Sequence, residues 1–179
     1  VGIFLLSKDV MLFMGGDAYV SGYVSLRILC FSLFFAVFGC YYSQGVLVSL
    51  RKEKYYFIAT VTSAVANVVL NLILVPFFGL NATAATTVIA EAMVMLICRH
   101  YSLSSLQHKE KVDLITIGLG CIGIIVACYL CNRCITGLIL RIIISIVVSV
   151  IAYFVILILL GNEVAKEFVV SAKKRILKR

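Results

Sequence analysis

The sequence contains few charged residues and only one proline. Asp, Glu, Lys and Arg make up 13% of its 179 residues, whereas soluble domains contain about 25%. Hydrophobic residues make up 63%, and the mean hydropathy is +1.14. This balance excludes an ordinary soluble domain and indicates a membrane protein.

Sequence signatures of several enzyme classes are also absent. There is no glycine-rich phosphate loop of the Walker type, which excludes a P-loop ATPase. Cys131 and Cys134 form a single C-x-x-C pair with no second pair and no histidine nearby, which disfavours a metal or redox site. No Ser/His/Asp set or carboxylate pair is visible, and the aspartates lie at or near the ends of apolar segments. We therefore predict a protein that is not an enzyme and that needs no metal and no cofactor.

Apolar runs of about 20 residues recur along the chain, which is the length needed to cross the hydrocarbon core as a helix. They lack the alternation that barrel strands require. The expected fold is all-α, a polytopic membrane helix bundle with about five full transmembrane helices and a partial N-terminal one. The segments are residues 1–14 (partial), 18–50, 55–75, 82–98, 112–131 and 138–160. Pro76 is expected to end one helix, and Asn81 or Thr83 to cap the next.

Lys and Arg alternate between the two sides of the predicted membrane. Twelve lie in residues 51–54, 99–111 and 166–179, and the loops of the other side hold one, Arg133. The positive-inside rule places the basic loops and the C-terminus in the cytoplasm. Topology therefore explains the net charge of +8 better than nucleic-acid binding does, and the basic tail is expected to rest on anionic lipid. The chain starts inside an apolar run without a signal peptide, so we expect a fragment of a longer protein.

Two polar groups lie within the predicted spans. Asn67 and Asn71 share one helical face, which Ser63 extends by a turn. They either fix helix packing by hydrogen bonds or form the polar wall of a substrate cavity. Glu91 lies near the middle of its segment, where a carboxylate is either a functional group that takes up a proton or a neutral or ion-paired structural acid.

Two arginines complete the candidates. Arg27 can meet a phosphate or an acidic sugar in a polar lumen, or it is a snorkelling or salt-bridged side chain near the outer interface. Arg141 lies close to the outer end of its helix, where an interface anchor is the favoured interpretation.

Several motifs between residues 14 and 100 resemble one transporter family. They are Met14-Gly15-Gly16-Asp17-Ala18-Tyr19, Leu26-Arg27-Ile28-Leu29, Gln44-Gly45, the basic hairpin 51–54, Asn67-x3-Asn71-x4-Pro76, Phe78-Gly79-Leu80-Asn81-Ala82-Thr83-Ala84-Ala85, and Glu91. The pattern resembles the C-terminal region of polysaccharide biosynthesis flippases, the Wzx-type O-antigen exporters of the multidrug/oligosaccharidyl-lipid/polysaccharide exporter superfamily. Asn81 departs from the glycine expected there.

The resemblance implies the second lobe of a two-lobed transporter, with residues 1–100 as lobe helices and 101–179 as two final helices and a tail. It implies that undecaprenyl-diphosphate-linked oligosaccharide crosses the inner membrane by alternating access. The implied partners are that lipid-linked oligosaccharide, membrane lipid, an N-terminal lobe or parent chain, and the polysaccharide polymerase machinery. The cavity candidates are Arg27, Gln44, Asn67, Asn71 and Glu91. A multidrug or cation antiporter of the same superfamily and a non-transport membrane subunit are the alternatives.

Overall fold

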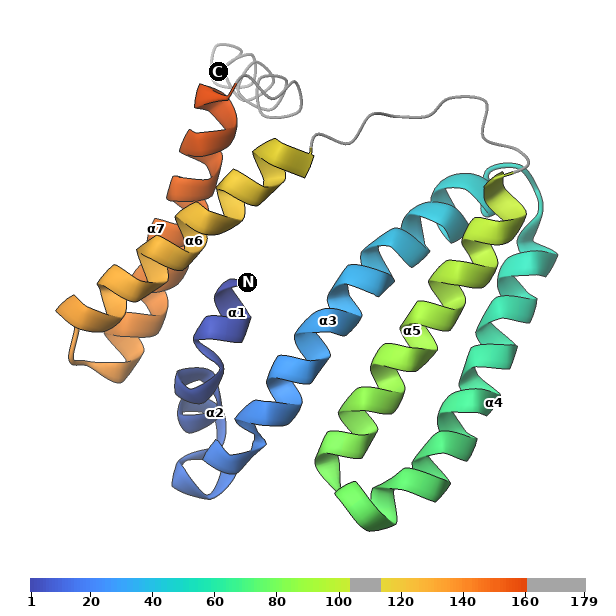
Figure 1. Cartoon of the computed structure of the whole chain (residues 1–179), viewed down its shortest axis with the longest axis horizontal. Coiled ribbons are helices and arrows are strands. Elements are labelled where there is room, and N and C mark those ends of the chain that lie inside the picture. The colour runs from blue at the N-terminus through green and yellow to red at the C-terminus, as the bar shows by residue number, and fades with distance from the viewer. Residues whose placement is uncertain (104–113, 161–179) are drawn as a thin grey trace, which may run out of the picture. The chain divides into compact units, whose positions relative to one another are not determined.

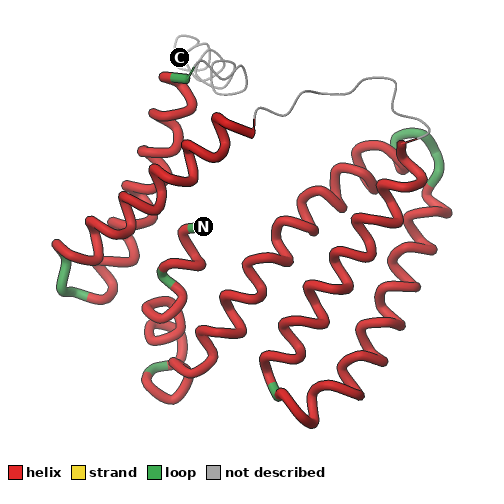
Figure 2. Tube along the Cα trace, viewed as in Figure 1, coloured by secondary structure: helices red, strands yellow, loops and turns green. Residues whose placement is uncertain are grey.

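The computed structural model describes residues 1–103 and 114–160, and all regular structure in these residues is helical (Figures 1 and 2). The prediction of an all-α helix bundle is therefore confirmed. The chain divides into two compact units, one formed by Val1–Phe13 with Lys111–Arg179 and the other by Met14–Glu110. The predicted division near residue 100 stays a prediction. The expected polar loop lies largely, and the basic tail wholly, outside the described residues.

Four helical stretches are long and apolar enough to cross a membrane: Asp17–Val48, Glu53–Phe78, Leu80–Leu103 and Leu138–Leu159. Gly118–Cys134 is a shorter apolar helix. Large apolar side chains such as Leu72, Phe77 and Leu159 are more than 70% exposed. Soluble proteins rarely expose contiguous apolar surface on this scale, whereas lipid covers it in a bilayer. The chain is a multi-pass membrane protein.

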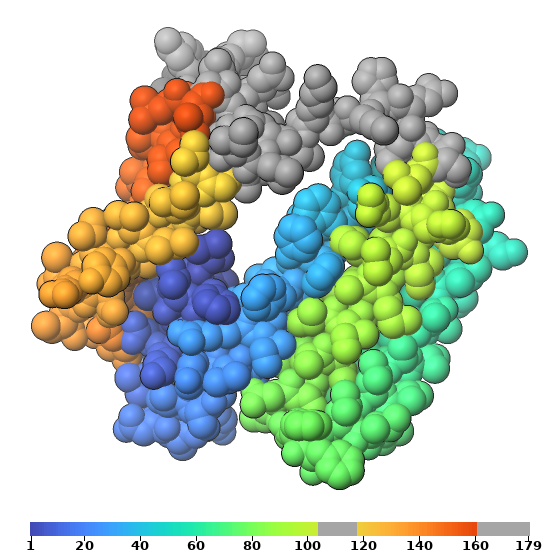
Figure 3. Space-filling model, in the orientation of Figure 1, coloured from blue at the N-terminus to red at the C-terminus, as the bar shows by residue number. Residues whose placement is uncertain are grey.

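The second unit is a layer of three long helices. It contains the 3-10 helix η1 (Asp17–Gly22), α3 (Tyr23–Cys40), the π-helical segment η2 (Tyr41–Val48), α4 (Glu53–Phe78) and α5 (Leu80–Leu103). α5 packs against both α3 and α4 and lies between them (Figures 1 and 3). α4 runs antiparallel to both α3 and α5, so α3 and α5 run in the same direction (Figure 1).

The register between α3 and α5 is fixed at two levels. Ser25 Oγ donates a hydrogen bond of 2.7 Å to Asn81 Oδ1 near the start of both helices. Further along, Gly39 is buried against the backbone of Met95. Both pairs have a separation of 56 residues. Each residue of α3 therefore lies level with the α5 residue 56 positions later. This relation gives the depth of Arg27 relative to Glu91.

The turn between α4 and α5 differs from the prediction. Pro76 lies inside α4, which continues to Phe78, so the expectation that the proline ends the helix is wrong. Proline removes the hydrogen bond that its own N–H would make and crowds the carbonyl one turn earlier, yet α4 continues past it for two residues. The helix ends because Gly79 leaves the helical region with φ of 56° while its N–H still bonds Val75 O at 2.9 Å.

The predicted caps of α5 are also wrong. The helix begins at Leu80, so Asn81 and Thr83 lie within its first turn. The Asn81 side chain accepts the hydrogen bond from Ser25 rather than one from its own helix. The side chain that sequence alone predicts as a helix cap therefore forms a tertiary contact between α3 and α5 instead.

A small core closes one end of the second unit. Leu47, Ala59 and Cys98 are fully buried there. The rings of Tyr55 and Tyr101 stack beside them with centroids 4.2 Å apart and an interplanar angle of 23°. This stack fixes the start of α4 beside the end of α5.

A hydrogen bond joins the C-terminal end of α5 to η2. The Ser102 hydroxyl donates to the Tyr42 carbonyl oxygen at 3.1 Å. A π-helix has wider turns than an α-helix and is often found at functional positions. The sequence pattern predicts one long segment here but not this change of helix type.

The first unit contains the short helices α1 (Gly2–Leu5) and most of α2 (Ser7–Gly15), with α6 (Leu114–Cys134) packed against α7 (Leu138–Leu159). The partial N-terminal span is thus two short helices rather than one. Glycines allow α6 and α7 to approach closely: a Cβ at Gly120 would overlap the Tyr153 ring, and one at Gly123 would overlap Ile156. This is the small-residue packing expected between membrane helices.

Candidate functional site

The asparagine pair of α4 forms a hydrogen-bonded network with α5. Asn71 Nδ2 donates to Asn67 Oδ1 at 2.7 Å and lies 3.0 Å from the Asn67 carbonyl oxygen. The buried Thr86 hydroxyl of α5 lies 3.0 Å from both Asn71 Oδ1 and the Thr83 carbonyl oxygen. The polar atoms of Asn71 therefore join two helices, which supports the packing interpretation for this residue. Asn67 uses its oxygens in this network, and no described residue accepts a hydrogen bond from its side-chain amide.

Glu91 lies at the midpoint of α5 and is half-buried. Its carboxylate forms no hydrogen bond or ion pair with any residue in 1–103 or 114–160. The pairing of Asn71 with Thr86 sets the antiparallel register, and this register places Asn67 level with Ala90, next to Glu91. One amide donor and one carboxylate acceptor therefore lie at the same depth in the second unit.

α5 presents different side chains on two of its faces. Ile89, Leu96 and Leu103 recur every seven residues and are 42%, 54% and 55% exposed. They form an apolar face suited to lipid. Thr87 and Glu91 are spaced by four residues on roughly the opposite side of the helix, and both are half-buried. The face that carries Glu91 is therefore a polar face within a membrane helix, and such faces usually meet protein or a water-filled cavity.

Arg27 lies at a different depth from Glu91. The α3–α5 register places Arg27 level with Thr83, eight residues before Glu91, which corresponds to roughly 12 Å along the axis. The guanidinium carbon of Arg27 lies 5.0 Å from the centroid of the Tyr23 ring, a distance typical of a cation–π contact. Arg27 is half-buried, near the end of the unit that topology predicts to be outside.

Gln44 lies near the opposite end, in η2, where its side chain is exposed and its carbonyl oxygen accepts a hydrogen bond of 3.2 Å from Ser49 Oγ. The structure thus places the five candidates at three depths. It brings Asn67, Asn71 and Glu91 to the middle and keeps Arg27 and Gln44 apart from them. That arrangement is not a compact catalytic centre, but it can contact an extended polar ligand at several points.

An ion pair in the first unit was not among the predicted contacts. Arg141 Nη2 lies 2.5 Å from Asp9 Oδ1, and the two side chains are 20% and 19% exposed. Arg141 Nε and Ser145 Oγ, one turn later, are both buried and have no hydrogen-bond partner within residues 1–103 and 114–160. Arg141 is therefore more than an interface anchor, because it holds α2 against α7. Two opposite charges within apolar runs are the sequence signal for such a pair.

The cysteine pair is split by burial. Cys131 is buried, whereas Cys134 at the end of α6 is exposed, and both thiols are free. Among the described residues, no group of three or more His, Cys, Asp and Glu is placed to hold a metal ion.

Together, the fold and the polar residues define a multi-pass helical membrane protein with a polar face at mid-depth. The chain matches no protein-family model, no curated protein and no solved structure. Its function is therefore argued from its own residues.

Proposed function

We propose that the chain forms one lobe of a flippase that translocates undecaprenyl-diphosphate-linked oligosaccharide repeat units across the inner membrane. The single observation that carries the proposal is Glu91 on the polar face of α5: its carboxylate has no partner among the described residues, and it lies level with the Asn67 amide, which has no described acceptor. A carboxylate held at mid-depth is costly unless a cavity, a second protein surface or a ligand covers it. The proposed second lobe, from the same polypeptide or a partner chain, supplies that cover.

The depths of the candidates suit a headgroup that contains sugar and phosphate. A carboxylate and an amide at one level accept from and donate to sugar hydroxyls. Arg27, roughly 12 Å away along the axis, offers a planar cation for phosphate. The lipid tail stays in the bilayer, so the transporter needs no covalent chemistry and works by rocking two lobes around the site. The resemblance at residues 14–100, which includes these same residues, agrees with the proposal.

The test is genetic and uses the full-length gene. We would delete it and measure surface polysaccharide together with lipid-linked repeat units on the cytoplasmic face. The flippase proposal expects polysaccharide to disappear and repeat units to accumulate. Wild type should restore export, whereas Glu91→Gln and Arg27→Ala should not.

Matched controls separate a specific role from general damage. Glu53→Gln and Arg133→Ala remove the same charges from exposed positions outside the candidate face, and both should restore export. Unchanged polysaccharide with altered drug sensitivity would favour the antiporter of the same superfamily. Full export by a variant with apolar replacements at Arg27, Asn71 and Glu91 together would favour a non-transport subunit.

A further inference from the structure

The side-chain amide of Asn67 has a fixed orientation, because the amide nitrogen of Asn71 holds it. Asn71 Nδ2 lies 3.0 Å from the Asn67 carbonyl oxygen and 2.7 Å from Asn67 Oδ1. A carbonyl oxygen only accepts hydrogen bonds, so the Asn71 atom beside it has to be the nitrogen. The Asn67 side-chain atom that this nitrogen also reaches then has to be the oxygen. The nitrogen of Asn67 therefore points away from Asn71 and offers N–H donors.

α5 holds the other side of the Asn71 amide. The Thr86 hydroxyl, which belongs to a fully buried residue, lies 3.0 Å from Asn71 Oδ1. The oxygen and the nitrogen of Asn71 are therefore both engaged, one by α5 and the other by Asn67. Asn71 cannot turn over without losing these bonds. The contacts from Thr86 through Asn71 thus fix which atom Asn67 presents.

Asn67 and Glu91 share a depth and a flank of the α4–α5 pair. The antiparallel register of the two helices places Asn67 level with the residue before Glu91. At roughly 100° per residue, both side chains turn to the flank opposite the one that carries the exposed Ile89 and Leu96 of α5. A ligand on this flank meets both groups.

The polar side chains of α5 on this flank offer acceptors rather than donors. Thr87 gives its hydroxyl hydrogen to the Thr83 carbonyl oxygen at 2.8 Å. The Glu91 carboxylate has no hydrogen-bond or ion-pair partner among the described residues, and in its ionised form it only accepts. Asn67 therefore supplies the donor at this depth, and Glu91 supplies the acceptor.

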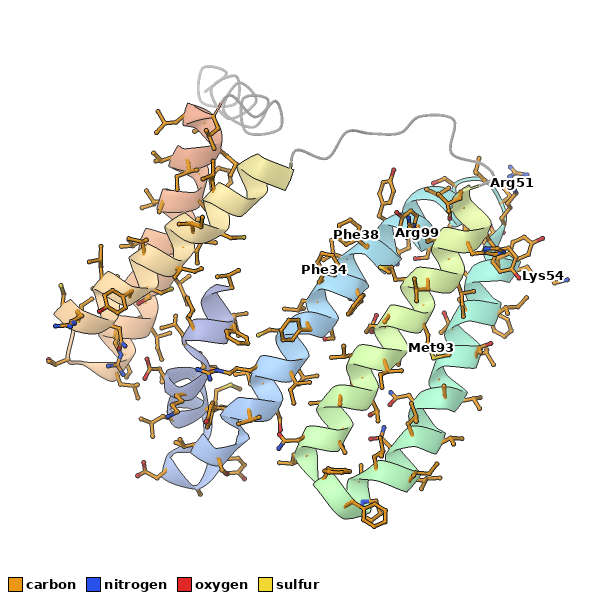
Figure 4. All side chains as sticks on the ribbon, viewed as in Figure 1. Phe34, Phe38, Arg51, Lys54, Met93 and Arg99 are labelled. Carbon is orange, nitrogen blue, oxygen red and sulfur yellow. The ribbon has the colours of Figure 1, made fainter. Side chains whose placement is uncertain are left out.

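The cations of the second unit lie at other depths. Arg51, Lys54 and Arg99 are found at one end of the unit (Figure 4). Arg99 follows Glu91 by eight residues, which is roughly 12 Å along the axis of α5, and Arg27 lies about as far in the opposite direction. Within the described part of the second unit, no Lys or Arg is therefore level with Glu91.

We propose that Asn71 is a positioning residue for ligand binding. It turns the N–H groups of Asn67 toward the ligand, and the site formed with Glu91 then binds a ring that carries neighbouring hydroxyl groups. One hydroxyl donates to the Glu91 carboxylate, and the oxygen of the next hydroxyl accepts from Asn67. A metal cation fits less well, because hard cations need oxygen ligands and the Asn67 oxygen is turned toward Asn71. This inference rests on the proposed transport of a sugar headgroup and adds the residue that selects it.

The test measures ligand binding by the full chain in lipid nanodiscs. The probes are methyl glucoside, a ring with neighbouring hydroxyls, observed by saturation-transfer NMR, and sodium ion, observed by sodium NMR. Wild type should bind methyl glucoside in preference to sodium. Asn67→Leu removes the donor itself and should lower the glucoside affinity about ten-fold.

Asn71→Leu removes the positioning contact and leaves Asn67 and Glu91 in place. The Asn67 amide can then turn its oxygen toward the ligand, so the glucoside affinity should fall about ten-fold while the sodium affinity rises. Asn81→Leu is the matched control, because it also removes an asparagine that bonds two helices, here through Ser25 Oγ at 2.7 Å. It lies ten residues from Glu91, roughly 15 Å along the axis, and should leave both affinities unchanged.

The rise in sodium binding is the readout that a merely structural role does not produce. Loss of both ligands in Asn71→Leu, or unchanged selectivity, would overturn the positioning role. Equal changes in Asn81→Leu would overturn it as well. A wild-type preference for sodium over methyl glucoside would overturn the ligand class.

These outcomes are separable from those of the proposed function. Selective glucoside binding by a chain whose deletion leaves polysaccharide export intact would support this inference and refute the flippase. Lost export together with no glucoside binding by wild type would support the flippase and refute this inference.

Discussion

Thr86 on α5 donates a hydrogen bond of 3.0 Å to the side-chain oxygen of Asn71 on α4. The bond joins two antiparallel membrane helices near the middle of the layer, and it orients the amide of Asn71 toward Asn67. A single interhelical contact thus sets both the packing of α4 on α5 and the arrangement of the polar pair.

We expect Asn71→Leu and Thr86→Val each to lower the free energy of unfolding by about 1 kcal/mol in mixed micelles, since both remove an interhelical hydrogen bond. The double variant should show a coupling energy of about 0.6 kcal/mol or more. Thr87→Val is the control, because the Thr87 hydroxyl bonds the Thr83 carbonyl within its own helix at 2.8 Å. Strict additivity of the Asn71 and Thr86 variants would contradict the network.

The glycines of α6 provide a second test with an internal control. Gly120→Ala should destabilise the α6–α7 pair by about 1–3 kcal/mol, because its Cβ would overlap the ring of Tyr153. Gly118→Ala, where nothing lies within 4 Å, should be neutral or stabilise the helix by about 0.5–1 kcal/mol. Unfolding curves of the two variants compare them directly. The same sign for both would show that α6 and α7 do not pack as described.

The ion pair between Asp9 and Arg141 predicts a rescue experiment. Asp9→Asn leaves Arg141 largely buried without its charge partner, and we expect a loss of about 3 kcal/mol in unfolding free energy. The exchanged pair Asp9→Arg with Arg141→Asp should recover part of that loss. If Asp9→Asn unfolds like wild type, the pair does not hold α2 to α7.

The end of α4 predicts opposite results for neighbouring residues. Gly79→Ala should cost about 1–2 kcal/mol, because its φ of 56° is strained for a residue with a side chain. Pro76→Ala should be neutral or stabilising, because it restores an N–H within a helix that already continues past this position. The measurement is again unfolding in mixed micelles. A larger loss of unfolding free energy for Pro76→Ala than for Gly79→Ala would show that the proline, and not the glycine, ends the helix.

Sequence alone predicted the class of fold and the long spans, because apolar length and the distribution of basic residues are strong signals in a membrane protein. It did not predict which residue ends α4 or which contact the Asn81 side chain makes. Pro76 looks like a stop, but Gly79 has the backbone freedom that ends the helix. Asn81 looks like a cap, but its side chain pairs with Ser25 across 56 residues, and no local pattern reports such a contact.

The candidate polar residues were found from sequence because polar groups stand out within apolar runs. Sequence alone did not predict which of these residues lie together. Their depth in the membrane depends on the register between helices. The sequence left two interpretations open for Asn67 and Asn71 together. The structure shows hydrogen bonds that pack Asn71 against Thr86 and Asn67. The amide of Asn67 has no described acceptor, and a cavity role for it stays a prediction.

The parallel packing of α3 on α5 has a consequence for biosynthesis. Ser25 meets Asn81 only after 56 further residues have been made, which takes about 3–11 s at 5–20 residues per second. During that interval α3 is in the translocon or the lipid without its partner, whereas Asn71 reaches Thr86 after only 15 residues. α3 therefore has to stay in the membrane without α5 for several times longer than α4 does.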